Sequence, residues 1–328
     1  GGIGPITLAA LAAAISEAGA LGTLAHPALL LEMKGQDEVG EDEQVAQVVA
    51  QVVDGIRTAV ALTDKPLAIN VRIAQEQPDA PAVLRAILEE RERDPKVAQQ
   101  LRVLTTSAGH PHMFGMNEEF TAAGMLHFHS VSSVRHAKTA KREGIDAVVA
   151  TGYEAAGHVG HEAVHTFVLI PAIAAAVDIP IVCAGGISDG VALAGGLALG
   201  ASMGYVGTRF LAAIECDYHD NMKKFLLERG ETDTAIIPAF YGPARFMKNP
   251  MVDRVQHLAD SGADPIDRMR EEGAALIKGA IDGDMDGGLM IGGQAADRIN
   301  AILSAQDIVD SMMSECEAAL DRMAGFRA

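Results

Sequence analysis

The chain carries the sequence AVVATGYEAAGHVGH at residues 147–161, and this stretch indicates both a fold and a site. Residues 147–150 form an apolar run typical of a buried strand, whereas the segment after them has neither helical nor strand periodicity. That segment holds three glycines and two histidines. Glycine lets the backbone approach a ligand closely, and histidine exchanges protons near neutral pH. We therefore predict a strand followed by a binding loop; the alternative is a tight strand-to-helix turn with a solvated histidine.

Strand and helix patterns alternate on both sides of this stretch. Strands that are apolar throughout are buried on both faces, and regular alternation with helices indicates a parallel sheet. We predict an α/β protein with a closed (β/α)8 TIM barrel, in which an eighth strand would precede Gly1. An open doubly wound sheet is the alternative, but no dinucleotide-binding or phosphate-loop glycine motif follows a predicted strand. The predicted strands cover residues 20–25, 67–71, 101–106, 124–129, 147–151, 181–184 and 203–206, and the predicted helices cover residues 7–18, 43–62, 81–93, 132–143, 166–177 and 189–199.

The pattern changes after Asp217. From there the sequence predicts helices and loops without clear strands, including an irregular stretch at residues 238–250. We therefore expect the barrel to cover residues 1–228 and a helical lobe over the barrel mouth to cover residues 229–328. The helical patterns of this lobe cover residues 264–279 and 295–323.

The composition limits the classes of partner. A formal net charge of -18 argues against nucleic acid and against anionic membrane surfaces, because both attract clustered Lys and Arg. No apolar run reaches the roughly 18 residues that a membrane span requires. Cys183, Cys216 and Cys316 lie far apart in the sequence and match neither a disulfide framework nor zinc spacing. We expect a cytoplasmic protein that acts on a small molecule.

Four side chains near the quoted stretch are types that bind metals, namely His158, His161, Glu162 and His165. Their spacing does not place them on one helical face together with an open coordination position. We therefore predict no metal site.

Two glycine-rich loops follow the last two predicted strands, with AGGISDG at residues 184–190 and GYVGTR at residues 204–209. Ligands of a (β/α)8 barrel bind at the C-terminal ends of its strands, where backbone N–H groups and helix N-termini bind phosphate. The sequence therefore predicts a phosphate site, the alternative being that the glycines serve only as caps and turns. Asn70, which ends an earlier strand, would contact a planar heterocycle or make a local turn.

Three motifs in this order resemble those of the nitronate monooxygenase (2-nitropropane dioxygenase) family of FMN-dependent barrels. They are GYEAAGH at residues 152–158, AGGISDG at residues 184–190 and GTRF at residues 207–210. The resemblance extends over most of the chain. The family also contains NADH:quinone reductases and flavin-dependent enoyl-thioester reductases.

The resemblance implies FMN at the barrel mouth and His158 as the active-site histidine beside the flavin. Ser130 stands where relatives often have a lysine close to the cofactor, which leaves less positive charge there. The residues implied to bind the phosphate are Gly185, Gly186, Gly207 and Thr208, and those implied near the ring are Gly2, Ile3, Gly4, Asn70, Ala156 and Gly157, with Ser130 at the cofactor as well.

The resemblance also implies the reaction class. We rank the oxidation of alkyl nitronates with O2 first, because the loop that contains His158 resembles that of nitronate monooxygenases. The alternative is reduction of a quinone or an enoyl thioester, with NAD(P)H as a candidate co-substrate. A flavin-binding barrel without turnover is the alternative outside enzymes, and a homodimer is the assembly to test.

Overall fold

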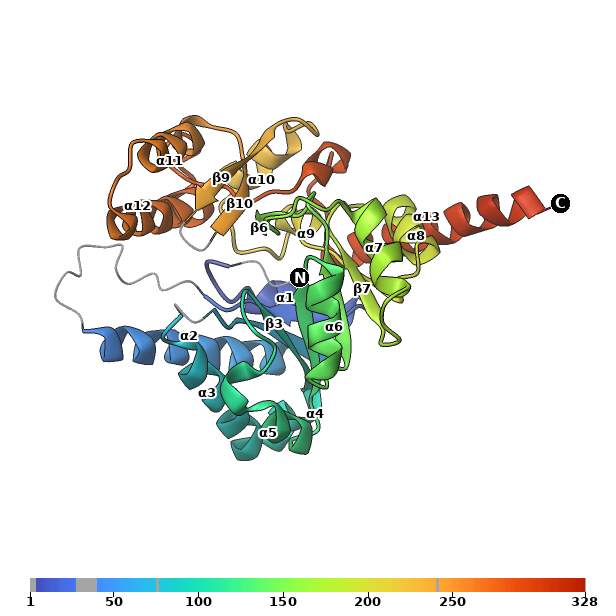
Figure 1. Ribbon diagram of the computed structural model, residues 1–328, viewed down its shortest axis with the longest axis horizontal. Coiled ribbons are helices and arrows are strands. Elements are labelled where there is room, and N and C mark those ends of the chain that lie inside the picture. Colours follow the sequence, from blue (N-terminus) through green and yellow to red (C-terminus); the bar gives the residue numbers. More distant parts are fainter. Residues whose placement is uncertain (1–3, 28–39, 75–76, 240–241, 328) are drawn as a thin grey trace. The chain divides into compact units, whose positions relative to one another are not determined.

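The computed structural model describes residues 4–27, 40–74, 77–239 and 242–327 (Figure 1). The chain forms two compact units. Unit 1 comprises Gly1–Ser130 and Thr139–Ala147, and unit 2 comprises Val131–Lys138 and Val148–Ala328. The expected boundary between a barrel and a lobe near residue 228 stays a prediction.

Unit 1 contains parallel strands whose order in the sheet follows the sequence, β1-β2-β3-β4. All four were predicted from apolar runs, and the observed bounds differ from the predicted ones by a few residues. The strands are β1 (Gly22–Leu24), β2 (Leu67–Arg72), β3 (Leu101–Ser107) and β4 (Leu126–Val131), and the helices are α1 (Ala9–Glu17), α2 (Glu41–Leu62), α3 (Ala80–Arg93), α4 (Pro95–Gln100), the short 3-10 turn η2 (Met113–Gly115) and α5 (Asn117–Ala122).

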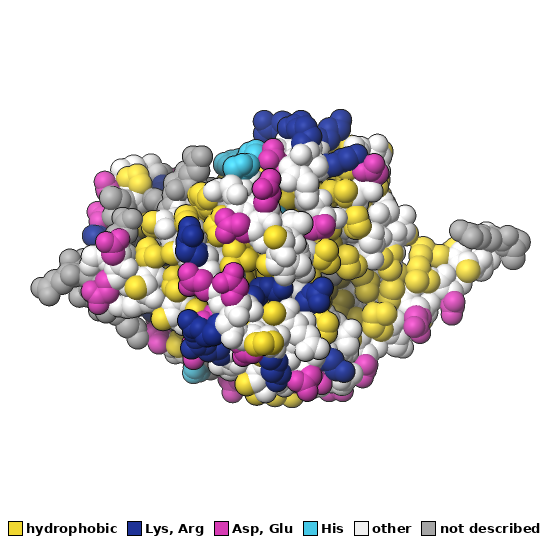
Figure 2. All heavy atoms as spheres, turned by 90° about the horizontal axis from the view of Figure 1, so that it is seen from below, with side chains coloured by type: hydrophobic (Ala, Val, Ile, Leu, Met, Phe, Trp, Pro, Cys, Tyr) yellow, Lys and Arg dark blue, Asp and Glu magenta, His cyan; other side chains and the backbone are white. Residues whose placement is uncertain are grey.

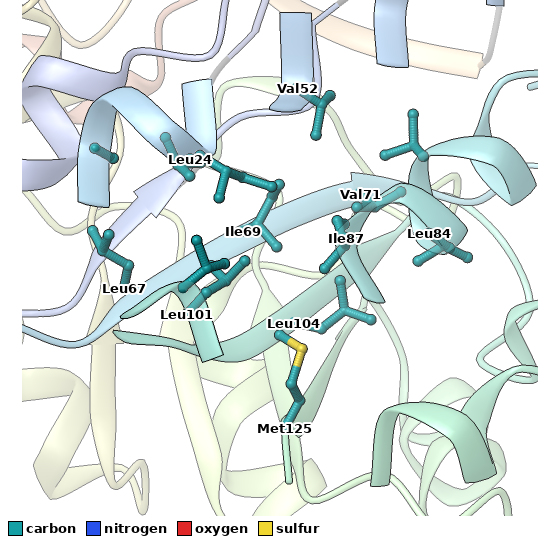
Figure 3. Packing of buried hydrophobic residues seen from close by; sticks show 14 of the residues in the cluster. Leu24, Val52, Leu67, Ile69, Val71, Leu84, Ile87, Leu101, Leu104 and Met125 are labelled. Atoms are coloured by element: carbon teal, nitrogen blue, oxygen red, sulfur yellow. The ribbon is translucent and has the colours of Figure 1, made fainter. Parts of the chain in front are cut away.

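The core of unit 1 lies between these strands and helices α2 and α3 (Figure 3). Ile69 of β2 and Leu104 of β3 are almost fully buried, and so is Ile87 of α3. Burying each such side chain contributes about 1.5–3 kcal/mol relative to leaving it exposed. This packing explains why continuous apolar runs, rather than alternating ones, marked the strands.

Helix α2 is the one helix in the described part of the chain that could cross a membrane by length and composition alone, between Asp42 and Leu62. In unit 1 its Val48, Val52 and Ile56 are buried in the core cluster that includes β2 and α3. The apolar face of α2 is therefore used in packing within the unit, as in the core helix of a globular domain.

Unit 2 contains a second set of parallel strands in the order β5-β7-β8. These strands and the helices that follow them were also predicted. Helix α8 begins at an Asp189 side chain that accepts a hydrogen bond of 2.8 Å from the Ala192 backbone N–H, a typical N-cap. The elements are β5 (Ala147–Thr151), β7 (Ile181–Ala184), β8 (Met203–Tyr205), α7 (Thr166–Ala174) and α8 (Gly190–Ala198), whereas α6 (Val134–Arg142) is divided between the two units.

The expectation that no strands follow Asp217 was wrong. Strands β9 (Thr234–Ala239) and β10 (Gly242–Met247) form an antiparallel hairpin, and β6 (Gly157–His158) pairs with the other side of β10. The prolines of this hairpin, Pro238 and Pro243, face each other in register. Proline argues against a strand in the sequence, and here a buried cluster of hairpin and helix side chains overrides that preference.

The other elements of unit 2 are helical. The helix predicted at residues 264–279 is present, whereas the one predicted at residues 295–323 is divided into a 3-10 turn and a long helix. Figure 1 shows that long helix, α13, running beside α8 and continuing to the C-terminus. These elements are α9 (Thr208–Leu211), α10 (Asp220–Leu227), α11 (Pro250–Asp260), α12 (Pro265–Ile277), the π turn η3 (Lys278–Asp282), η4 (Gln294–Arg298), α13 (Ala305–Ala324) and η5 (Gly325–Arg327).

Candidate functional site

The loop after β5 is tied to the loop after β7 at its first residue. The Gly152 backbone N–H donates a hydrogen bond of 2.9 Å to the Ala184 carbonyl oxygen. A Cβ atom on Gly152 would lie 1.9 Å from Thr166 Oγ1, so only glycine fits at this close approach. The predicted glycine-rich loop therefore has a packing reason for its first glycine.

Glu154, two residues further along the same loop, is fixed to the start of α7. Its Oε2 accepts hydrogen bonds of 3.0 Å from the Thr166 backbone N–H and 2.9 Å from the Thr166 hydroxyl, which caps α7. The Thr166 hydroxyl also lies 3.0 Å from the Gly185 carbonyl oxygen, and His165 Nδ1 lies 3.3 Å from Glu154 Oε1. The loops after β5 and β7 are thus one connected structure.

Gly185 and Gly186 lie in the left-handed region, with φ of 92° and 79°. A Cβ atom on Gly185 would lie 2.9 Å from the Gly152 carbonyl oxygen, which adds a steric reason for glycine. Gly186 lines an open cleft of about 430 Å³ within unit 2. The other residues that line the cleft are Glu154, Ser188, Asp189, Val191, Ala192, Gln294, Ala295, Asp297 and Arg298.

The N-terminus of α8, at the edge of the cleft, is already occupied by carboxylates. Glu315 Oε2 accepts a hydrogen bond of 2.9 Å from the Gly190 backbone N–H, and Asp189 caps the Ala192 N–H. Arg298 forms an ion pair with the Asp189 carboxylate. An anion in this cleft would therefore need donors from outside the first turn of α8.

Of the four predicted phosphate residues, Gly186 lines this cleft, whereas Gly185, Gly207 and Thr208 do not. Within the described residues, the backbone N–H groups of Gly186, Gly207 and Thr208 donate to no protein acceptor. The Ser188 hydroxyl, which lines the cleft, is buried and has no hydrogen-bond partner there either. Buried polar groups are normally paired, so a ligand with an acceptor oxygen would satisfy the Ser188 hydroxyl, whereas Gly186 is exposed and its N–H is open to solvent or to a ligand.

Residues 293 and 294, which the sequence analysis did not assign to the site, join the loop after β8 to the loop after β5. The Gly293 backbone N–H donates a hydrogen bond of 3.0 Å to Thr208 Oγ1, and the Gln294 N–H donates one of 3.1 Å to the Glu154 carbonyl oxygen. A Cβ atom on Gly293 would lie 2.9 Å from that same oxygen. The glycines at residues 292 and 293 are the only local signal of this close approach.

His158 lies in β6, with its side chain exposed. Its backbone is in register with Ala244 of β10, and the following residue, Val159, donates a hydrogen bond of 3.0 Å from its N–H to the Pro243 carbonyl oxygen. The predicted binding loop is therefore held by a strand pairing at the histidine. Ala156 and Gly157 precede His158 in the same segment.

The remaining predicted cofactor residues belong to unit 1. Gly2 and Ile3 lie outside the described residues. A Cβ atom on Gly4 would lie 3.1 Å from the His26 carbonyl oxygen. Asn70 in β2 is half-buried and in register with Thr105, and Ser130 in β4 is half-buried.

Beside Gly4, unit 1 contains a buried contact between His26 and Asp79 that the sequence analysis did not predict. His26 Nε2 lies 2.9 Å from Asp79 Oδ2, and His26 Nδ1 accepts a hydrogen bond of 3.2 Å from the Arg72 backbone N–H. Since Nδ1 is an acceptor, the proton of the neutral ring is on Nε2 and points to the carboxylate. Burial lowers the pKa of His26. Burial is the largest single influence on Asp79 and acts to raise its pKa, but the hydrogen bond and charge of His26, together with Arg72 and Gln77, outweigh it and lower that pKa.

A second buried cluster joins two strands of unit 1. The Thr106 hydroxyl oxygen lies 2.6 Å from His127 Nε2 and 2.8 Å from His129 Nδ1. Burial, with a smaller contribution from His129, lowers the pKa of His127 to about 3. His127 is therefore neutral at physiological pH and acts as a hydrogen-bonding core residue.

Two further groups have no arrangement suited to chemistry. Burial raises the pKa of Cys183 to about 11, so its thiol stays protonated and is a poor nucleophile. Among the residues that the structure describes, no three His, Cys, Asp or Glu side chains are grouped to hold a metal ion.

The parallel α/β architecture with glycine-rich loops at its strand ends is that of the barrel enzymes, which frequently have a phosphate-binding site at this position. A family model for nitronate monooxygenase matches residues 1–315, and the chain belongs to that family. Proteins of this family are flavin-dependent oxidoreductases, and this chain is one of them. The family prediction and the enzyme class are thereby confirmed.

Two curated relatives differ in name. A nitronate monooxygenase from Paraburkholderia phytofirmans is 29% identical, with 74% of this chain and 71% of the relative covered. A protein from Rhodococcus jostii named "(3aS,4S,5R,7aS)-5-hydroxy-7a-methyl-1-oxo-octahydro-1H-indene-4-carboxyl-CoA dehydrogenase" is 26% identical, with 94% of each chain covered.

Solved structures confirm the fold class. FabK from Thermotoga maritima aligns with a TM-score of 0.84 and 28% identity, covering 99% of this chain and 94% of its own. A nitroalkane oxidase from Streptomyces ansochromogenes aligns with a TM-score of 0.76 over 97% of this chain and 94% of its own, at 23% identity, and shows the fold alone. The predicted α/β barrel fold is therefore confirmed, with seven parallel strands among the described residues, whereas the predicted C-terminal lobe contains the β9–β10 hairpin and is not purely helical.

Proposed function

We propose that the protein binds FMN and oxidises alkyl nitronates with O2. The observation that carries the proposal is the set of backbone N–H groups at Gly186, Gly207 and Thr208 that donate to no acceptor among the described residues. Family membership and the nitronate monooxygenase relative support the reaction.

The residues of unit 2 fit the phosphate of FMN. Two glycines with positive φ present the loop after β7, and the Ser188 hydroxyl in the adjacent cleft lacks a partner within the described chain. Thr208 starts helix α9. Carboxylates also line the cleft, but the charge of Asp189 is offset by its ion pair with Arg298. Gly185, Gly186, Gly207 and Thr208 would therefore hold the phosphate.

The assignment of residues to the flavin ring rests on the family resemblance and belongs to the same proposal. It names Gly2, Ile3, Gly4, Asn70, Ser130, Ala156 and Gly157.

When bound, FMN supplies the transfer of electrons between substrate and O2. The protein contributes binding, orientation and proton transfer. In the proposal, the imidazole of His158 accepts or donates a proton at one ring nitrogen, which histidine can do near neutral pH. The pairing of β6 with β10 supports this role, because it fixes the backbone from which the ring extends.

The visible absorption spectrum tests the cofactor first. The purified protein, mixed with FMN and then desalted, should retain the yellow flavin spectrum. Anaerobic addition of an alkyl nitronate should bleach it, and O2 should restore it. A protein that retains no flavin after this treatment would contradict the proposal.

The second candidate function is an NAD(P)H-dependent reduction of an enoyl thioester or a quinone. The dehydrogenase relative, whose name specifies a carboxyl-CoA and which matches along 94% of each chain, favours a thioester ligand. Rapid anaerobic bleaching by NADH or NADPH, with no response to a nitronate, would select this alternative. Bleaching by neither would favour a flavin-binding barrel without turnover, for which Ser130 in place of a lysine is the hint.

The other partner predictions are part of this proposal. Figure 2 shows acidic and basic side chains interspersed on one face, which together with the net charge of -18 supports a cytoplasmic protein without nucleic-acid or membrane partners. A homodimer is supported by the apolar side chains that α13 and the turn after it expose, Met313, Leu320, Met323 and Phe326. Analytical ultracentrifugation tests the assembly.

A further inference from the structure

Arg245 is a buried cation in the strand that pairs with the His158 segment. Its side chain is 5% exposed, and its Nη2 donates a hydrogen bond of 2.8 Å to the Tyr153 carbonyl oxygen. Its Nη1 donates one of 2.8 Å to Thr234 Oγ1 on β9. The guanidinium carbon lies 5.6 Å from the centre of the Tyr153 ring. One side chain therefore links the hairpin to the start of the loop.

The same strand also holds the end of that loop. Arg245 is in register with Gly157, Ala244 is in register with His158, and the Val159 N–H donates to the Pro243 carbonyl oxygen at 3.0 Å. Both ends of the segment from residue 153 to residue 159 are thus fixed to β10. The start is fixed by a side chain and the end by the backbone.

Burying a guanidinium is costly unless its donors are paired, so Arg245 is a demanding choice for simple packing. Its rigid planar fork holds two donors in fixed, separated directions, whereas the donors of lysine share one rotatable nitrogen and apolar residues have none. The two acceptors lie on different segments, the loop after β5 and strand β9. This geometry suits a residue that sets a distance between two backbones.

We propose that Arg245 is a positioning residue that holds the backbone of residues 153–159 so that the His158 imidazole is placed for proton transfer. The proposal rests on the proposed role of His158 in turnover. A displacement of about 1 Å at a catalytic group can cost about 10²-fold in rate, so loss of Arg245 should lower kcat rather than flavin affinity.

Three variants remove the two hydrogen bonds of Arg245 to different extents. Arg245→Met keeps the approximate length and removes both donors, and we expect kcat to fall by about 10²-fold with KM changed less than about threefold. Arg245→Lys keeps the charge and should recover part of the rate. Thr234→Val removes only the acceptor on β9 and should have the smallest effect. The dissociation constant of FMN should stay within about threefold in all three.

A matched control separates positioning from general stability. Arg91 in unit 1 is also buried, and it donates to the carbonyl oxygens of Ala98, Leu101 and Ala123. Arg91→Met should lower the melting temperature as Arg245→Met does, but leave the kcat of the folded protein unchanged. Equal losses of kcat in the two variants would overturn the proposal.

A double-mutant cycle tests whether Arg245 acts through His158. If it does, Arg245→Met combined with His158→Ala should be no slower than His158→Ala alone. Multiplied losses in the double variant would show that Arg245 acts independently of His158, which contradicts the proposal.

Hydrogen exchange needs no turnover. It therefore tests the positioning role of Arg245 even if the wild-type protein oxidises no nitronate and the proposed function is wrong. In Arg245→Met, the amides of residues 157–159 should exchange faster, while those of α7 and α8 keep their protection. Unchanged exchange at residues 157–159 would overturn the positioning role, whatever the activity.

Discussion

The backbone N–H of Gly293 donates a hydrogen bond of 3.0 Å to the hydroxyl oxygen of Thr208, and 85 residues separate the two in sequence. This bond joins the loop after β8 to the segment that also contacts Glu154. The geometry of the proposed phosphate site in unit 2 therefore depends on a residue outside the predicted motifs.

Thr208→Val should destabilise the protein and weaken FMN binding. It leaves the buried Gly293 N–H without an acceptor, which costs about 1–3 kcal/mol of unfolding free energy. The Kd of FMN, measured by fluorescence titration, should rise about tenfold or more. Thr121→Val, at an exposed hydroxyl that bonds within its own helix, is the control and should change neither quantity. An unaltered Kd in Thr208→Val would show that the hydrogen bond between Gly293 and the Thr208 hydroxyl does not shape the phosphate site.

Gly185→Ala should be destabilising by about 1–3 kcal/mol, because its φ is 92° and the new Cβ would lie 2.9 Å from the Gly152 carbonyl oxygen. Gly195→Ala is the matched control, since a Cβ there meets nothing within 4 Å and helix α8 should gain roughly 0.5–1 kcal/mol. Urea denaturation measures both. If both variants shift in the same direction, the strained turn at Gly185 is not needed for folding.

His158→Ala should retain FMN and slow turnover by about 10²-fold or more, the usual scale for losing a positioned proton-transfer group. His161→Ala, at a neighbouring exposed imidazole, is the control and should keep most of the activity. Steady-state kinetics at saturating substrate checks both. Full activity in His158→Ala would exclude this residue from the mechanism.

Acid should destabilise unit 1 through its buried imidazoles. The pKa of His127 is about 3 in the folded state and about 6.5 when exposed, so the unfolded chain binds more protons between these values. The resulting loss is present only below pH 6.5 and grows by about 1.4 kcal/mol per pH unit as the pH falls toward 3. The lowered pKa of His26 acts in the same direction.

Unfolding measured from pH 8 to pH 4.5 tests this pH dependence. His127→Asn keeps a polar group beside Thr106 but does not titrate, so its stability should fall less steeply with acid. His257→Asn, at an exposed position on α11, should follow the wild-type slope. Parallel curves for all three proteins would contradict the assignment to His127.

The parallel strands could be predicted because each one has a recognisable local sequence pattern. Residues 147–151 and 181–184 are short apolar runs that end at a glycine or glycine pair, and the structure places β5 and β7 there. Burial on both faces makes such a run independent of its distant neighbours. The loops that follow were predictable for the same reason, since their glycines sit at the strand ends.

Residues that meet through tertiary contacts could not be predicted. The His26–Asp79 pair joins positions 53 apart, and no pattern around either residue marks it. The hairpin of β9 and β10 was missed because Pro238 and Pro243 argue against strands, whereas Phe246 and Ile237 are buried in a cluster built with distant helices. Local preference was overridden by packing at these places.

All three thiols of the chain are buried, and Cys183, Cys216 and Cys316 all belong to unit 2. A thiol-specific dye can therefore label the native protein only during transient opening of that unit. The labelling rate measures how often β7, α13 or the segment after α9 that contains Cys216 opens, and unit 1 does not contribute to the signal.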